Sequence, residues 1–242
     1  MRTLVTGGTR GIGAAVARRL AADGHDLVLG YARDDAAASR TASACRELDV
    51  SCTTVRGDLT TDAGIEALFA EAGELTGVVN NAGATLHLGP LAATPSDVVR
   101  ATVDLNLTSA LLVARAAVQA LGRSYGGSGG VLVNISSGAA TLGSPGEYVQ
   151  YAAAKAGVDA LTLGLAQEVA GDGVRVVGVA PGIIETSIHA DAGEPGRVQR
   201  VGPLVPIGRA GLPDEVANAV AWLLCDEASY VTGTTLRVAG GR

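Results

Sequence analysis

The sequence predicts an α/β fold in which a parallel sheet is covered by helices on both faces. Short apolar runs alternate with longer stretches of helical periodicity along the 242 residues, which is typical of this class. Several of the apolar runs lack polar alternation, as expected for strands buried on both faces. Aromatic residues make up only 3% of the chain, and the 34 glycines suit tight turns and close packing of helices on a sheet.

Seven apolar runs predict the strands: Thr3–Thr6, Leu27–Gly30, Cys52–Val55, Val78–Asn80, Val131–Ile135, Val174–Val179 and Leu236–Val238. Apolar stripes at helical spacing lie between them: Ile12, Val16 and Leu20, and later Val158, Leu161, Leu165 and Val169. The last helix is predicted to begin at Pro213, because Asp214 and Glu215 follow it and suit the positive end of the helix dipole.

No composition shift marks a linker, so we expect one doubly wound domain over residues 1–242. The segment 183–212 holds three prolines and shows little periodicity. Loops of this length are uncommon in compact domains and are often binding loops, so we expect a mobile flap over the substrate. The run Glu194–Arg197 (Glu-Pro-Gly-Arg) predicts an exposed turn near its tip.

Charge and composition exclude several classes of function. The net charge of −6 gives no basic face for nucleic acid. No run of about 18 apolar residues predicts a membrane span, and the first residues lack the layout of a signal peptide, so we expect a cytoplasmic protein. Three widely spaced cysteines without a Cys-x-x-Cys pair and only three histidines predict no metal site.

A glycine-rich turn follows the first predicted strand and opens the first helix. Such a turn lets backbone N–H groups approach a pyrophosphate at a helix N-terminus, as in dinucleotide-binding Rossmann-like folds. The spacing is Gly-x-x-x-Gly-x-Gly, and glycine turns also occur for structural reasons alone. The candidate binding residues in it are Gly7, Thr9, Arg10, Gly11, Ile12 and Gly13.

The end of the second predicted strand indicates which cofactor fits. An acidic residue there would bind the ribose 2′-OH of NAD, but this strand ends at Tyr31 and no carboxylate follows before Asp34. Arg10 and Arg33 suit a 2′-phosphate instead, unless both are simply solvated. We therefore expect NADP(H), with NAD(H) the weaker alternative.

Tyr151 and Lys155 are four residues apart on a predicted helix, so their side chains share a face. A nearby cation stabilises a phenolate, so we expect Lys155 to lower the pKa of Tyr151 and make the phenol an acid or base, although such pairs are also common on surfaces. Ser136 and Ser137 end a predicted strand, where open α/β sheets place their sites. Asn106, within a predicted helix, is either functional or a buried structural amide.

These pieces, in this order and spacing, resemble the short-chain dehydrogenase/reductase family over essentially the whole chain. The matching residues are Thr6–Gly13, Asp58-Leu59, Asn80–Gly83, Asn106, Ser136-Ser137, Tyr151-x-x-x-Lys155 and Pro181-Gly182. The resemblance is greatest to the branch of 3-oxoacyl-carrier-protein reductases and glucose 1-dehydrogenases. It implies a seven-stranded parallel sheet and a homotetramer, with a dimer as the alternative. For the cofactor it implies adenine contacts from Asp58 and Leu59, ribose contacts from Asn80, Ala82 and Gly83, and nicotinamide contacts from Pro181, Gly182, Ile183 and Thr186.

The resemblance also implies reduction of a carbonyl, or oxidation of a secondary alcohol, by a Ser-Tyr-Lys-Asn site. Members commonly place the serine thirteen residues before the tyrosine, but that position is Gly138 here. We assign Ser137, with Ser136 as the substitute, and expect Asn106 to hold a water that links Lys155 to solvent.

Two rival functions remain open: a non-catalytic NADP-binding regulator or scaffold, and an epimerase or dehydratase on the same fold. The substrate is a small molecule that the sequence does not specify. Candidate residues for lining its pocket are Leu86, His87, Leu88, Ala139, Tyr148, Ile188 and His189.

Overall fold

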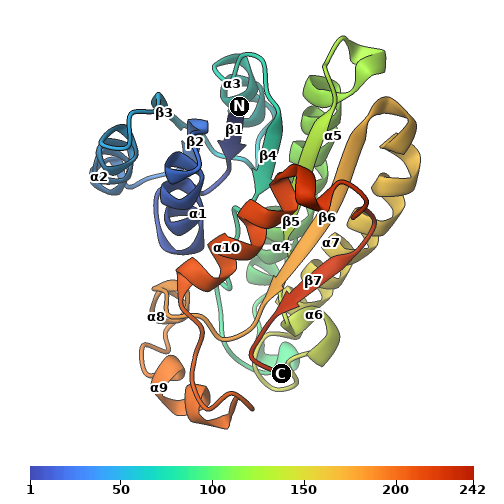
Figure 1. Cartoon of the computed structure of the whole chain (residues 1–242). Coiled ribbons are helices and arrows are strands. Elements are labelled where there is room, and N and C mark those ends of the chain that lie inside the picture. The colour runs from blue at the N-terminus through green and yellow to red at the C-terminus, as the bar shows by residue number, and fades with distance from the viewer.

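The computed structural model describes residues 1–242, and its centre is one parallel sheet of seven strands (Figure 1). The strand order is β3-β2-β1-β4-β5-β6-β7. The strands are β1 (Arg2–Val5), β2 (Asp26–Tyr31), β3 (Cys52–Arg56), β4 (Gly77–Asn80), β5 (Gly130–Ile135), β6 (Val174–Pro181) and β7 (Thr235–Val238). All seven predicted strands are therefore confirmed, with ends that differ by only one or two residues.

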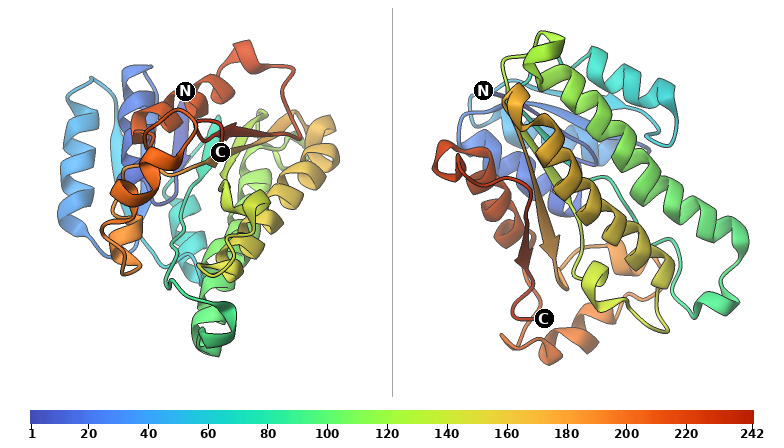
Figure 2. Two further views of the ribbon diagram at one scale, coloured as in Figure 1. Left: turned by 90° about the horizontal axis from the view of Figure 1, so that it is seen from below. Right: turned by 90° about the vertical axis from the view of Figure 1, so that its right-hand side faces the viewer.

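Helices cover both faces of this sheet, as the two turned views make clear (Figure 2). They are α1 (Gly11–Ala22), α2 (Asp35–Arg46), α3 (Asp62–Ala70), α4 (Ser96–Val103), α5 (Ser109–Leu121), α6 (Ala139–Leu142), α7 (Val149–Val169), α8 (Ile188–Asp191), α9 (Arg197–Val201) and α10 (Pro213–Leu224). One apolar core lies between the sheet and α1, α2 and α10, and a second lies between the sheet and α3, α5 and α7. The doubly wound fold is confirmed.

Local sequence explains where several helices begin. The Asp34 carboxylate accepts the N–H of Ala37 at 2.8 Å and caps α2. Thr61 caps α3 in the same way through Gly64. Pro213 is the first residue of α10, as predicted, and Glu215 accepts the N–H of Leu212 at 2.7 Å.

A π-helical turn at Asp104–Thr108 joins α4 and α5 into a continuous helix. Residues 96–121 are long and apolar enough to cross a membrane, although no uninterrupted apolar run marks them in the sequence. Length and composition alone are weak evidence, because core helices of soluble proteins pass the same test.

The segment 183–212 corrects one expectation. It contains two short helices, α8 and α9, where the sequence shows no periodicity. The side chain of Arg197, placed in an exposed turn by the sequence, is only 1% exposed. Helices of four or five residues are too short to leave a periodic pattern.

Candidate active site

The site lies where the strand order reverses, between β1 and β4, beyond the carboxyl ends of the strands. A cleft of about 1270 Å³ opens there. The turn before α1, the loops after β2, β4, β5 and β6, and the start of α7 all contribute to its walls. In Figure 1, α8 and α9 lie side by side at this end of the sheet, and α6 lies at the same end on the opposite side of the view.

The glycine turn is shaped for close approach of another molecule. A Cβ on Gly13 would lie 2.1 Å from the carbonyl oxygen of Gly7, so no other residue fits there. Gly7 and Gly11 adopt φ values of +60° and +51°, which favour glycine. The turn and the N-terminus of the twelve-residue helix α1 therefore suit a pyrophosphate.

The turn is tied to the loop after β4 by side chains of both segments. The Thr6 hydroxyl accepts the N–H groups of Asn81 and Ala82 at 2.8 and 2.9 Å. Asn81 Nδ2 in turn donates to the carbonyl oxygens of Thr6 and Gly7. Both loops are therefore held in place by the protein itself.

The end of the cleft where the sequence predicts the adenosine of a cofactor holds Tyr31, Arg33 and Arg10. The Tyr31 hydroxyl donates to Asp35 at 2.9 Å, and Asp35 also pairs with Arg56. The Asp34 carboxylate caps α2, and the Asp35 carboxylate contacts Tyr31 and Arg56, so both already have partners within the chain. Arg10 reaches across the cleft mouth and pairs with Asp191 of α8 at 3.0 Å.

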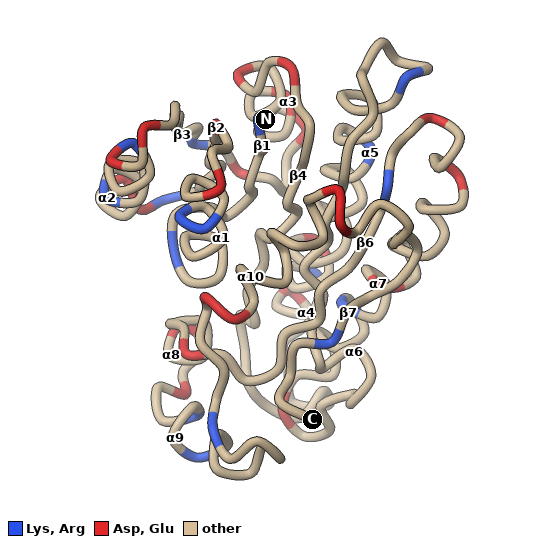
Figure 3. Tube along the Cα trace, in the orientation of Figure 1, with Lys and Arg blue, Asp and Glu red and all other residues tan.

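Charged residues of both signs are interspersed along the chain (Figure 3). No group of three or more His, Cys, Asp or Glu side chains gathers as a metal site would require.

Tyr151 and Lys155 lie in the first turns of α7, and both side chains are buried. Lys155 Nζ donates to the carbonyl oxygen of Ile135 at 2.8 Å and lies 5.8 Å from the centre of the Tyr151 ring. Burial raises the pKa of Tyr151 to about 12, although the Ser137 hydroxyl beside it acts in the opposite direction. Burial lowers the pKa of Lys155 to about 8.

The expectation that Lys155 lowers the pKa of Tyr151 is therefore wrong for this structure. The physical reason is that removal of the phenol from water opposes the phenolate, and this effect outweighs the opposing hydrogen bond with Ser137. Tyr151 is therefore protonated at neutral pH and can act as a proton donor.

The two serines after β5 make different contacts. Ser136 is 3% exposed, and its hydroxyl donates to the backbone oxygen of Lys155 at 3.3 Å. Ser137 is less buried, lines the cleft and accepts the N–H of Ala139 at 3.1 Å. Ser137 is thus the serine whose hydroxyl lies beside the Tyr151 phenol.

Asn106 and Asn80 lie behind the cleft wall rather than in it. Asn106, fully buried in the π-helical turn, donates to the carbonyl oxygens of Ala84 and Thr102 and accepts the N–H of Ala84. Its amide hydrogens are both used, so it fixes the loop beside Gly83. Asn80 donates to Ala110 and Asn134, and its neighbour Asn81, which was given no cofactor contact in the sequence prediction, lines the cleft instead.

The other predicted cofactor residues line the cleft together. They are Gly7, Thr9, Arg10, Gly11, Ile12, Gly13, Tyr31, Arg33, Asp58, Leu59, Ala82, Gly83, Tyr151, Lys155, Pro181, Gly182, Ile183 and Thr186. Of the candidate substrate residues, Leu86, Ala139, Tyr148, Ile188 and His189 line it, whereas His87 and Leu88 do not. Burial lowers the pKa of His189.

Comparison with known proteins agrees with this geometry. The family profile described as enoyl-(acyl carrier protein) reductase matches residues 7–242. An uncharacterised oxidoreductase of Escherichia coli, YgfF, is 41% identical over 243 residues, covering 99% of this chain and 98% of that protein. The 3-oxoacyl-[acyl-carrier-protein] reductase FabG of the same organism is 38% identical, with 98% and 95% covered.

Among solved structures, a short-chain dehydrogenase of Burkholderia cenocepacia in complex with NADP superposes with a TM-score of 0.89. It is 31% identical, and the match covers 99% of this chain and 96% of that one. Sequence, sheet order and cleft together show that this chain is an oxidoreductase of the short-chain dehydrogenase/reductase family, near the branch that contains the 3-oxoacyl-carrier-protein reductases.

Proposed function

We propose that this protein is an NADP(H)-dependent ketoreductase that interconverts a small-molecule ketone and its secondary alcohol. The single observation that carries the proposal is the cleft, which joins the glycine turn to a buried tyrosine and lysine and to the hydroxyl of Ser137. Arg10 and Arg33 at the adenosine end support the choice of NADP(H). The Burkholderia dehydrogenase, which was solved in complex with NADP, is consistent with that choice.

The chain's own residues divide the chemistry between them. The bound nicotinamide supplies the hydride in reduction and accepts it in oxidation. Tyr151, protonated because its pKa is about 12, donates its proton to the carbonyl oxygen. Ser137 donates a hydrogen bond to the same oxygen and fixes its position.

Lys155 has two tasks in this proposal. Its ammonium group, anchored on Ile135, faces the cleft and would hold the ribose hydroxyls. With a pKa of about 8, it also releases a proton readily enough to resupply Tyr151. Asn106 acts as a positioning residue, because its amide fixes Ala84 beside Gly83 and Lys155.

The whole chain works as one domain in this proposal, with residues 183–212 as a flap over the substrate, and it assembles as a homotetramer. Large apolar side chains that remain exposed on the single chain support assembly: Leu111, Leu163, Trp222 and Leu236. Light scattering on the purified protein tests this point, and a monomer would contradict it.

The replacement Tyr151→Phe tests the mechanism. It removes the proton donor and leaves the glycine turn and Lys155 in place, so we expect turnover to be lost while NADP affinity stays near the parent's. Ketone reduction is followed through NADPH absorbance, and cofactor affinity is measured by fluorescence titration. A Tyr151→Phe variant that retains the parent's kcat would refute the assignment.

A further inference from the structure

Arg197 is the most deeply buried charged side chain outside the proposed reaction. It lies at the start of α9 in the flap, yet its side chain is only 1% exposed, and it is the largest fully buried residue of the chain. Arginine is almost never fully buried unless it is paired. Its burial therefore indicates a specific set of partners.

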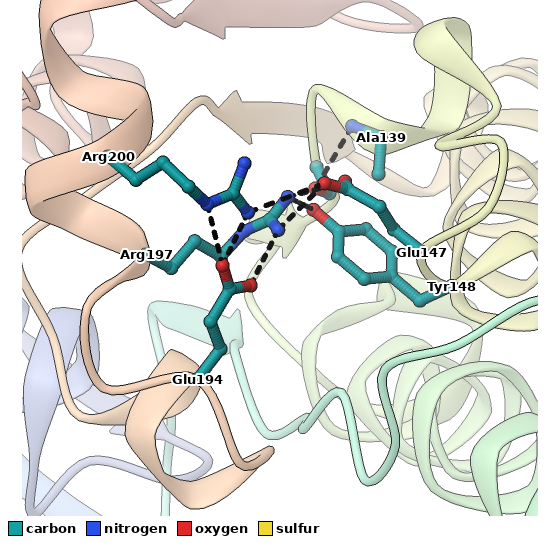
Figure 4. A network of polar contacts seen from close by, with 7 residues as sticks. Ala139, Glu147, Tyr148, Glu194, Arg197 and Arg200 are labelled. Atoms are coloured by element: carbon teal, nitrogen blue, oxygen red, sulfur yellow. Dashed lines mark hydrogen bonds and ion pairs between the residues drawn. The ribbon is translucent and has the colours of Figure 1, made fainter.

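Those partners connect the flap to the loop before α7, the helix that contains Tyr151. Arg197 donates through Nη1 and Nη2 to the two oxygens of Glu147, at 2.9 and 2.5 Å, in a bidentate pair (Figure 4). Nη1 also donates to Glu194, a second acid within the flap, at 3.0 Å. The guanidinium lowers the pKa of Glu147, so that carboxyl stays ionised. Glu147 precedes α7 and lies four residues before Tyr151.

A third contact leads from Arg197 toward the reacting tyrosine. Nη2 donates to the hydroxyl of Tyr148 at 2.8 Å, and the guanidinium carbon lies 5.0 Å from the centre of that ring. The Tyr148 ring then meets the Tyr151 ring edge-on, with centres 5.6 Å apart at an interplanar angle of 89°. Tyr148 is therefore held between the flap arginine and the proposed proton donor.

Stability alone is a poor explanation for this arrangement. Buried ion pairs cost desolvation, and well-packed apolar residues in their place are often as stable. The Nε of Arg197 even lacks a hydrogen-bond partner. What the pair provides is a fixed direction, because a bidentate fork defines the distance and angle between flap and loop.

We propose that Arg197 is a positioning residue for the reduction: it fastens the flap to Glu147 and, through Tyr148, fixes the ring of Tyr151 against the substrate. This inference rests on the proposed ketoreductase function. Tyr148 and Glu147 also line the cleft, so the same contacts shape the substrate end. No residue of the cluster lies in the glycine turn, and the flap meets that turn through a separate ion pair, Asp191–Arg10.

The test compares four variants with the parent. Arg197→Met removes the fork, and Tyr148→Phe removes only its third acceptor. The double variant Arg197→Met/Glu147→Leu replaces the ion pair with apolar groups, which restores stability without restoring the fork. Arg200→Met is the matched control, because Arg200 pairs with the same two acids, Glu194 and, at 3.8 Å, Glu147, but its side chain is 55% exposed and lies outside the cleft.

We expect the double variant to unfold near the parent's Tm but to lose kcat by about 10- to 100-fold, since small misplacements of reacting groups have effects of that size. NADP affinity should stay unchanged in every variant. Tyr148→Phe should lose part of kcat, and Arg200→Met should stay within about twofold of the parent, as an exposed pair contributes little.

Two results would overturn the inference. The first is a double variant with the parent's kcat, and the second, should that variant not fold, is a Tyr148→Phe variant with the parent's kcat. Failure of the proposed function looks different, because the parent itself would then reduce no ketone. In that case, hydrogen exchange still tests whether Arg197 fastens the flap. Exchange at residues 197–201 should be faster in Tyr148→Phe than in the parent, and unchanged in Arg200→Met. Equal exchange in both variants would overturn the inference.

Discussion

Replacement of Arg10 by alanine tests the cofactor preference most directly. Arg10 immediately precedes α1, and its side chain is 61% exposed. Its Nη1 lies 3.0 Å from Asp191 of the flap, so the side chain already has an anionic partner. If it also binds a 2′-phosphate, the phosphate must compete with that carboxylate.

The magnitude follows from these two contacts. A charge-assisted hydrogen bond to a phosphate contributes about 1.5–3 kcal/mol, whereas an exposed ion pair such as Arg10–Asp191 contributes about 0–1 kcal/mol. The difference is roughly 0.5–3 kcal/mol, which corresponds to about a 2- to 150-fold loss of NADP affinity in Arg10→Ala. NAD lacks the phosphate, so its affinity should not change.

The assay measures kcat/KM with NADPH and with NADH, together with the Kd of each oxidised cofactor. Arg18→Ala is the control, because Arg18 lies on α1, which Arg10 precedes, is exposed and stays outside the cleft. Asp191→Asn should tighten NADP binding by up to about fivefold, since it removes the competing charge. Equal losses for both cofactors in Arg10→Ala would refute the reasoning, as would no loss for either.

Three further predictions concern the catalytic residues and the flap. Ser137→Ala should lower kcat by about 100-fold, as loss of an oxyanion donor does, while Ser136→Ala should keep most activity in the same ketone assay; the reverse order would assign the other serine. The pKa of Lys155 falls from 10.5 to about 8 on folding, so between these values the unfolded chain binds more protons and stability should rise with pH by roughly 3 kcal/mol. Urea unfolding at pH 8 and 10 should show about 2 kcal/mol of this rise in the parent and not in Lys155→Met; parallel curves would contradict it. Hydrogen exchange at residues 185–193 should be faster than at 197–201 in the free protein, and it should slow when NADP and a ketone analogue are added. Exchange at 185–193 that is already slow and does not change with ligand would argue against a closing lid.

The fold was predictable because its signals are local. Several of the buried strands are near-continuous apolar runs, and the helix that begins at Pro213 has its proline and two acids in adjacent positions. Most of the cleft followed from the same logic, since the loops at the carboxyl ends of parallel strands meet at one edge.

The parts that sequence reasoning missed depend on tertiary contacts. The partner that buries Arg197 is Glu147, fifty positions earlier, and no local pattern connects them. The direction of the Tyr151 pKa shift depends on burial, which spacing does not reveal. Asn80 and Asn81 are neighbours of the same type, so only the backbone direction decides which one faces the cleft.

The bonds among Thr6, Gly7 and Asn81 have a thermodynamic consequence for cofactor recognition. Because the chain has already ordered these loops when it folds, the nucleotide end loses little conformational entropy when a dinucleotide binds. The flap end, which we expect to be mobile in the free protein, has more conformational freedom left to lose. Calorimetry should therefore show a small entropic penalty for a fragment such as 2′-phospho-ADP-ribose, and a larger one once the nicotinamide half and a ketone analogue engage the flap.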